Sequence, residues 1–205
     1  QSLFFLKKTI KNQLYKKDQY FIMLHHDEDF NDKNFFIKLS KLIKNNFYPD
    51  VISMTVCVDY NNLFKNKIHT TSSQRSWLFK NYFDYILLRN YIGPVSSLVI
   101  RYKKNIPIFD IKLKWLIDVD FYKKLKNYKN WIFTDDLFLF SDQKNNVSLT
   151  LKYQFQIKKL YNKEIKLISR KYNLKFKFLD YIIWAFVRIS NKLKYFINIK
   201  KYRND

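Results

Sequence analysis

Two spacings of apolar residues alternate along this chain, and each change of spacing predicts a change of secondary structure. Continuous apolar runs at residues 20–24 and 51–58 predict two buried β-strands. Apolar residues recur at helical spacing in residues 3–14, after Ser2, and again after Asp32. Ser and Asp are typical N-caps, so each of these segments is predicted to be a helix. The order helix, strand, helix, strand predicts an α/β fold with a mostly parallel sheet flanked by helices.

The middle of the chain continues this alternation with shorter segments. In chain order we expect a polar stretch at 59–75, a helix at 74–88, a strand at 97–101, a loop at 109–115, a helix at 118–126 and short strands at 131–133 and 137–140. Asp135 and Asp136 lie between the last two strands, where the pattern predicts a turn.

From residue 153 onwards, basic residues flank apolar positions at helical spacing, which predicts one or two amphipathic helices with a break at Asn173. We therefore divide the chain into a domain at 1–150 and a basic helical tail at 151–205. One interpretation of the tail is a helical appendage packed on the domain. The other is an interfacial segment on an anionic membrane, because basic side chains attract anionic headgroups and an apolar face adds burial.

Composition narrows the classes of protein and of partner. The chain has 205 residues, of which 47% are hydrophobic, so it suits one domain, or one domain with an appendage, around a sizeable core. Its formal net charge of +22 favours nucleic acid, an anionic membrane or a phosphorylated ligand as partner. Richness in Lys, Asn, Ile, Phe and Tyr is typical of an AT-rich genome. The single cysteine, Cys57, excludes an internal disulfide and suits a reducing cytoplasm.

An acidic triplet at residues 27–29 directly follows the first predicted strand in this basic chain. Two carboxylates about 4 Å apart repel by roughly 4 kcal/mol at an effective dielectric near 20, and a divalent cation turns that repulsion into binding. Oxygen ligands suit Mg²⁺ or Mn²⁺, which often bridge to phosphates. Asp27 and Asp29 are therefore candidate metal ligands, and a solvated turn is the alternative.

Two further segments carry candidate chemistry. Residues 91–97 read YIGPVSS and contain Gly93, the one glycine of the chain, which indicates a backbone position that other residues fit poorly. Residues 109–125 read FDIKLKWLIDVDFYKKL. Asp118 and Asp120 begin the helix predicted there, where they also suit the helix dipole.

Taken in order, the acidic triplet, the YIGPVSS segment and the FDIKLKWLIDVDFYKKL segment resemble the family 2 glycosyltransferases with a GT-A fold. The resemblance covers residues 15–150. It implies that Asp27 and Asp29 contact Mn²⁺ or Mg²⁺ and the diphosphate of a nucleotide-sugar donor. It also implies that Asp118 is the general base that takes a proton from the acceptor hydroxyl, in a metal-dependent transfer that inverts the anomeric carbon.

The same resemblance implies four substrate-side residues. Trp115 would stack on a sugar face, Gly93 and Ser96 would shape the acceptor side, and Asp120 would support the site. The chain departs from the family in two places: Ile117 stands where an acid is common, and residues 140–148 lack the His or Arg that is common there.

The family's nucleotide-binding βαβ units lie upstream of the metal motif, and only one predicted helix and one strand precede Asp27, so we expect an N-terminally truncated domain. The expected acceptor is a glycan or a lipid-linked molecule in surface polysaccharide biosynthesis. The expected location is the cytoplasm, peripheral at the inner face of the cell membrane. Two alternatives stay open: a basic RNA-binding or ribosomal protein of an AT-rich genome, and a non-catalytic pseudoenzyme of the same fold.

Overall fold

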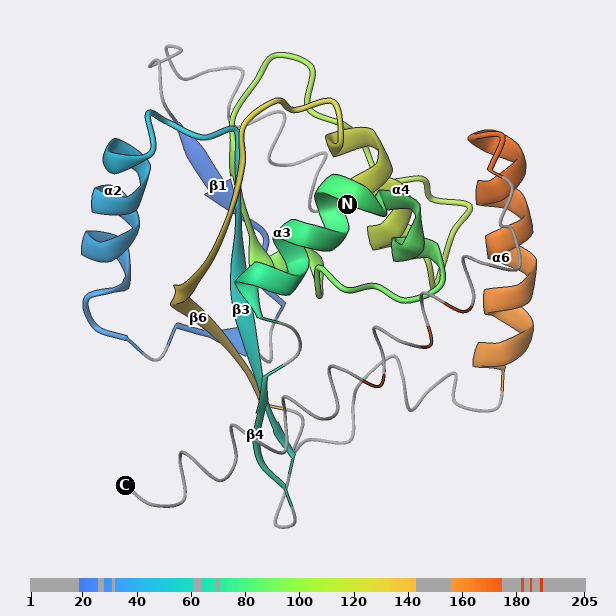
Figure 1. The fold of residues 1–205 in the computed structure, drawn as a ribbon, viewed down its shortest axis with the longest axis horizontal. Helices are drawn as coiled ribbons and strands as arrows, with labels where there is room; N and C mark the ends of the chain where they lie inside the picture. The colour runs from blue at the N-terminus through green and yellow to red at the C-terminus, as the bar shows by residue number, and fades with distance from the viewer. Residues whose placement is uncertain are drawn as a thin grey trace.

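The computed structural model describes residues 19–25, 28–30, 32–60, 64–68, 71–142 and 156–174, together with residues 182, 185 and 189. These residues form an α/β fold in which a mixed sheet has helices on both faces (Figure 1). The helix predicted at 3–14 lies outside the described residues, as does nearly all of the tail after residue 174.

The sheet is mixed, which corrects the prediction of a mostly parallel one. Its strands, in spatial order, are β1 (Tyr20–Ile22), β5 (Leu98–Arg101), β3 (Val51–Tyr60), β6 (Trp131–Asp142) and β2 (Glu28–Asp29), with β4 (Phe64–Ile68) paired to β3. Strands β1 and β3 are both antiparallel to β5, and β6 is parallel to β3. Strands β1, β3 and β6 therefore run in one direction, as the alternation of helices and strands predicts. The prediction fails because β5 is inserted between β1 and β3 in the opposite direction, and because β2 and β4 are also antiparallel to their partners.

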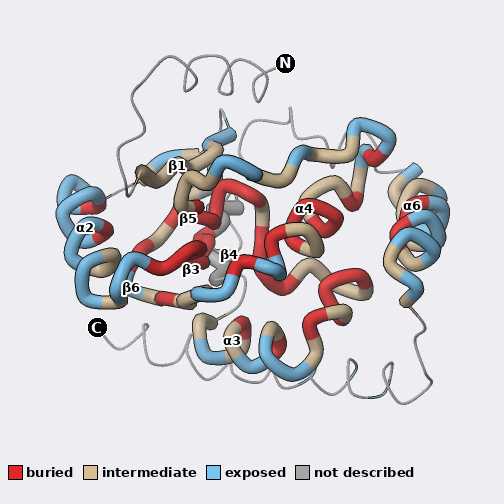
Figure 2. The backbone as a smooth tube through the Cα atoms, turned by 90° about the horizontal axis from the view of Figure 1, so that it is seen from above, coloured by how far each residue is buried: buried red, intermediate tan, exposed pale blue. Residues whose placement is uncertain are grey.

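Each face of the sheet has its own hydrophobic core. The helices are α2 (Phe35–Asn45), α3 (Ser72–Asn81), α4 (Ile117–Leu125) and α6 (Ile157–Lys171), with 3₁₀ helices η1 (Phe83–Leu87) and η2 (Val95–Ser97). Helix α2 covers one face, α3 and α4 cover the other, and α6 lies beyond α4 (Figures 1 and 2).

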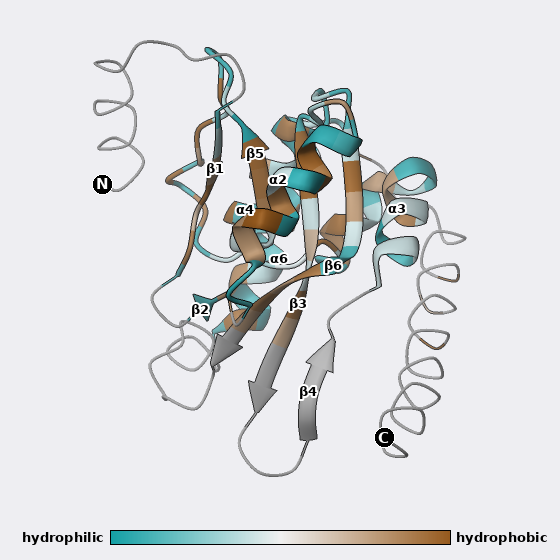
Figure 3. Ribbon diagram, turned by 90° about the vertical axis from the view of Figure 1, so that its left-hand side faces the viewer, coloured by the Kyte–Doolittle hydropathy of each residue, from teal (hydrophilic) through white to brown (hydrophobic). Residues whose placement is uncertain are grey.

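Strand alternation divides neighbouring residues between these two cores. Ile52 and Val99 pack with Phe35 of α2, whereas Val51 and Ile100 belong to the core on the side of α3 and α4. Figure 3 shows the apolar segments concentrated along β3, β5 and β6. Full burial of each such side chain contributes about 1.5–3 kcal/mol, so the two-sided packing of these strands accounts for much of the stability.

The helix predicted at 74–88 is instead α3 followed by η1. The chain leaves the α conformation at Tyr82, where φ is −141° and ψ is 46°. In η1, Phe83, Tyr85, Ile86 and Leu87 are all buried. An α-helix lying on the sheet would direct some of these four side chains to solvent, and the tighter turn buries them all.

Two other predictions for the middle of the chain need correction. The polar stretch at 59–75 contains β4, which forms an antiparallel pair with β3. The two short strands around Asp135 and Asp136 are one strand, β6, whose register against β3 shifts between Ser53 and Thr55. The extra residues bulge out of the ladder instead of forming a turn.

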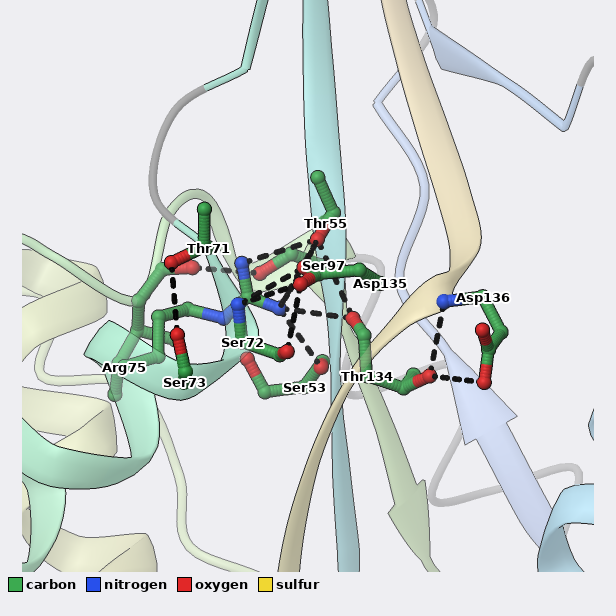
Figure 4. A network of polar contacts seen from close by, with 11 residues as sticks. Ser53, Thr55, Thr71, Ser72, Ser73, Arg75, Ser97, Thr134, Asp135 and Asp136 are labelled. Atoms are coloured by element: carbon green, nitrogen blue, oxygen red, sulfur yellow. Dashed lines mark hydrogen bonds and ion pairs between the residues drawn. The ribbon is translucent and has the colours of Figure 1, made fainter. Parts of the chain in front are cut away.

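The bulge in β6 places Asp135 beside a buried arginine (Figure 4). The Asp135 carboxylate accepts hydrogen bonds from the Ser72 backbone N–H at 2.9 and 3.0 Å and from the Ser72 hydroxyl at 2.6 Å. Asp135, in strand β6, therefore caps the N-terminus of α3. Arg75, which is 1% exposed, lies 3.7 Å from Asp135 and donates to the Thr134 carbonyl at 3.0 Å. Burial lowers the pKa of Arg75 to about 10, and Asp135 opposes that shift. The guanidinium therefore stays charged and ties α3 to the centre of the sheet.

We predict that Arg75→Ala lowers the free energy of unfolding by about 3 kcal/mol, because it leaves buried acceptors without their donor. Urea denaturation at neutral pH measures the change. The matched control is Arg170→Ala, which alters an exposed residue of α6 and should stay within about 0.5 kcal/mol of the wild type. Equal stability of the two variants would contradict the role assigned to Arg75.

Candidate functional site

The three segments that carry the family resemblance reach the same end of the sheet. Ile22, at the end of β1, is paired with Val99 near the start of β5. The residues after β1 and the residues before β5 therefore leave the sheet side by side. Strands β1, β3 and β6 all run toward this side of the sheet, and β3 and β6 continue beyond the level at which β1 ends.

Asp118 reaches this end from the first turn of α4. Its carboxylate accepts a hydrogen bond from the backbone N–H of Val95, and the charges of His25 and Glu28 act on it. Burial raises the pKa of Asp118 to about 6, and Glu28 adds to that rise, while His25 and the Val95 N–H oppose it. A carboxylate with this pKa is ionised above about pH 6, and in that form it can accept a proton.

Glu28 links the acidic triplet to the YIGPVSS segment. The Ser96 hydroxyl donates to one Glu28 oxygen at 2.7 Å, and the backbone N–H of His25 donates to the other at 2.8 Å. Glu28 is partly buried and Ser96 is fully buried. Both carboxylate oxygens are thus engaged, and Glu28 is held near Asp118.

Gly93 forms the corner that aims Val95 and Ser96 at the acids. Its φ of 110° lies in the region that favours glycine, and an added Cβ would come within 3.3 Å of the Ser97 hydroxyl. The Asn90 side chain holds this corner from both sides: its amide donates to the Gly93 carbonyl at 2.6 Å and its oxygen accepts from the Gly93 N–H at 3.1 Å. The Tyr122 hydroxyl of α4 donates to the same carbonyl at 2.9 Å, which ties the corner to the helix of Asp118.

The structure brings some of the predicted site residues together and places others apart. Asp118, Gly93 and Ser96 lie at one site, with Glu28 and His25 as partners that the sequence analysis did not assign. Asp27 lies outside the described residues. Asp29 is exposed and accepts the N–H of Phe30 at 2.6 Å, so strand alternation directs the middle acid of the triplet, Glu28, to Asp118. The alternation of side chains along a strand could therefore have identified Glu28 from the sequence.

Trp115 and Asp120 have structural contacts. Trp115 is partly buried against the core on the side of α4. Asp120 is 0% exposed, and Lys124 and Lys171 each lie 2.7 Å from its carboxylate. Asp120 therefore joins the first turn of α4 to the end of α6 through Lys171.

The donor set at this end suits a hard cation only in part. Among the described residues, no group of three or more His, Cys, Asp or Glu side chains is arranged to hold a metal ion. Asp29 offers an exposed carboxylate of the kind that Mn²⁺ and Mg²⁺ prefer. Within the part of the chain that the structure describes, no helix is both long enough and apolar enough to cross a bilayer.

Comparison of the chain with models of protein families, with curated proteins and with solved structures found no match.

We predict that Asp118→Asn stabilises the protein at pH 8 and not at pH 4. The pKa of Asp118 is about 6 in the folded protein against an ordinary value of 3.8, so the folded state binds this proton more tightly than the unfolded state. The stability that Asp118 confers is therefore present below pH 4 and is lost as the pH rises through 6. Urea denaturation should show an advantage of the variant that grows to about 1–3 kcal/mol at pH 8. An advantage that does not depend on pH would contradict the raised pKa.

Proposed function

We propose that the chain is a GT-A-like glycosyltransferase domain that moves a sugar from a nucleotide-sugar donor to a hydroxyl of a glycan or lipid-linked acceptor. One observation supports this proposal most. The three segments that resemble the family meet at one end of the sheet, through Glu28, Ser96 and Asp118. In a chain with a net charge of +22, two acids placed close together suit a role in chemistry rather than in solubility.

In the proposed reaction, Asp118 is the general base. Its carboxylate accepts the proton of the acceptor hydroxyl, and the acceptor oxygen attacks the anomeric carbon from the side opposite the leaving group. The bond between that carbon and the diphosphate oxygen breaks, and the nucleoside diphosphate leaves with the electron pair. Direct attack inverts the anomeric configuration. The Val95 N–H fixes the direction of the Asp118 carboxylate, and burial, with a smaller contribution from Glu28, raises the pKa of Asp118 to about 6.

Asp27 and Asp29 are the residues that would hold Mn²⁺ or Mg²⁺. When bound, the cation neutralises the negative charge of the diphosphate. Gly93 and Ser96 would shape the acceptor side of the site indirectly, because both are buried and Ser96 holds Glu28.

The proposed setting is the cytoplasm, at the inner face of the cell membrane and in surface polysaccharide biosynthesis. The basic residues of the tail suit an anionic membrane surface. On the described part of the tail, Lys159, Lys163, Lys166 and Arg170 are exposed and follow one another along one side of α6. This side would face the lipid headgroups.

We predict that transfer depends on an ionised Asp118. Below pH 6, kcat/KM should fall about tenfold for each pH unit, because only the carboxylate accepts the acceptor's proton. Asp118→Asn should lower kcat by about a hundredfold or more and leave donor binding unchanged. Initial rates with a radiolabelled nucleotide sugar measure both effects. Glu28→Gln serves as a comparison, since loss of its charge lowers the pKa of Asp118 and should move the acid limb below pH 6. Full activity of Asp118→Asn would refute its assignment as the base.

We predict that the protein binds UDP or GDP only in the presence of Mn²⁺ or Mg²⁺, and that Asp29→Ala removes this binding. Isothermal titration calorimetry with and without Mn²⁺ measures it. Asp136→Ala is the control, because Asp136 is an acid of the β6 bulge outside the site and should bind like the wild type. Metal-independent binding, or strong salt-dependent binding of RNA by the same preparation, would favour a basic RNA-binding protein instead.

A further inference from the structure

Helix α6 contacts the N-terminal end of α4 through one buried carboxylate. Glu164, the one acid within α6, is 3% exposed. Its carboxylate accepts three successive backbone N–H groups, from Lys114 at 2.8 Å, Trp115 at 2.9 Å and Leu116 at 2.7 Å. These N–H groups belong to the turn that leads into α4, and they converge on the Glu164 carboxylate. A buried carboxylate with three such donors is fully satisfied, and it fixes the direction in which the helix starts.

A second contact between α6 and α4 holds α4 one turn further along, at Asp120. Lys171, at the end of α6, donates to Asp120 at 2.7 Å and to Asp110 at 3.0 Å, and the Tyr172 hydroxyl donates to Asp120 at 2.9 Å. Ile168, between the two contacts, is 1% exposed and belongs to the core beside α4.

Asp118 lies between these two contacts. It comes two residues after Leu116, whose N–H binds Glu164, and two residues before Asp120, whose carboxylate binds Lys171. The loop of residues 102–116 runs without a helix or strand from the end of β5 to this point. Such a loop leaves the start of α4 poorly determined unless another element holds it.

We infer that Glu164 is a positioning residue of the site, which holds the start of α4 so that the Asp118 carboxylate meets the Val95 N–H. Residues 156–174 then belong to the active domain rather than to a separate tail. The effect of Glu164 on the reaction rests on the proposed function. Its effect on the placement of Asp118 does not.

Glu164→Gln tests this inference, because the amide keeps the size of the side chain and replaces one acceptor oxygen with a donor. Two variants of α6 serve as controls. Lys166→Gln changes an exposed neighbour, and Ile168→Val weakens the same interface by packing alone. Should Glu164→Gln fail to accumulate as folded protein, Lys171→Met at the more exposed contact carries the same test.

The first measurement is amide hydrogen exchange, with amides of β3 as the reference for global opening. In Glu164→Gln, exchange should accelerate about tenfold or more at Lys114, Trp115 and Leu116 and also at Val95, whose N–H reports where the Asp118 carboxylate lies. The controls should leave Val95 unchanged relative to β3. Acceleration confined to residues 114–116, or equal acceleration at Val95 in Ile168→Val, would overturn the inference.

The second measurement is steady-state kinetics, if the wild-type protein transfers sugar. Displacement of a general base by about 1 Å costs on the order of a hundredfold in rate, so kcat should fall by about that factor in Glu164→Gln while the donor KM is unchanged. Unchanged kcat in an active preparation would also overturn the inference. A wild-type protein without transferase activity refutes the proposed function alone, and the exchange at Val95 then decides whether Glu164 places Asp118.

Discussion

Strand β3 is the constraint on which the rest of the structure depends. It pairs along one edge with β6, along the other with β5 and, further on, with β4, and its first residues alternate between the two cores. Val51 faces the core under α4, and Ile52 and Met54 face the core under α2. A strand buried on both faces reads as a continuous apolar run, which is why residues 51–58 were predicted so directly. Because β5 takes its register from β3, β3 also determines where the loop before β5 emerges.

The acidic residues of this basic chain fall into two groups, those that join distant elements and those that lie close to one another at the candidate site. Glu164 and Asp120 are buried and surrounded by donors, and Asp135 caps α3 beside the buried Arg75. In each of these cases a carboxylate joins elements that are distant in the sequence. Glu28 and Asp118 differ, because these two acids lie near one another and burial raises the pKa of Asp118 despite the opposing effects of His25 and the Val95 N–H. Two carboxylates placed close together repel each other, and the free-energy cost of this repulsion is more typical of ligand-binding or catalytic sites than of structural ion pairs.

The sequence analysis located the segments of the candidate site better than its individual residues. The acidic triplet, the glycine corner and the start of α4 were all identified from local patterns, and the structure brings described parts of all three together. The pattern of two aspartates around Glu28 directed attention to Asp27 and Asp29, while β2 pairing turns Glu28 toward Ser96. The contribution of α6 was not predicted, because Glu164 lies about fifty residues from the N–H groups it binds and has no local signature.

The sequence by itself determined the helices and strands with strong periodicity, namely β1, β3, α2, α4 and α6, and the break after α6, where Asn173 has a φ of 52°. Local spacing suffices for these because each buries one face or one continuous run. The tertiary structure decided the direction of β5, the bulge in β6 and the end of α3 at Tyr82. It also decided which acid faces Asp118. These features depend on contacts between segments far apart in the chain, and a single sequence carries no spacing rule for such contacts.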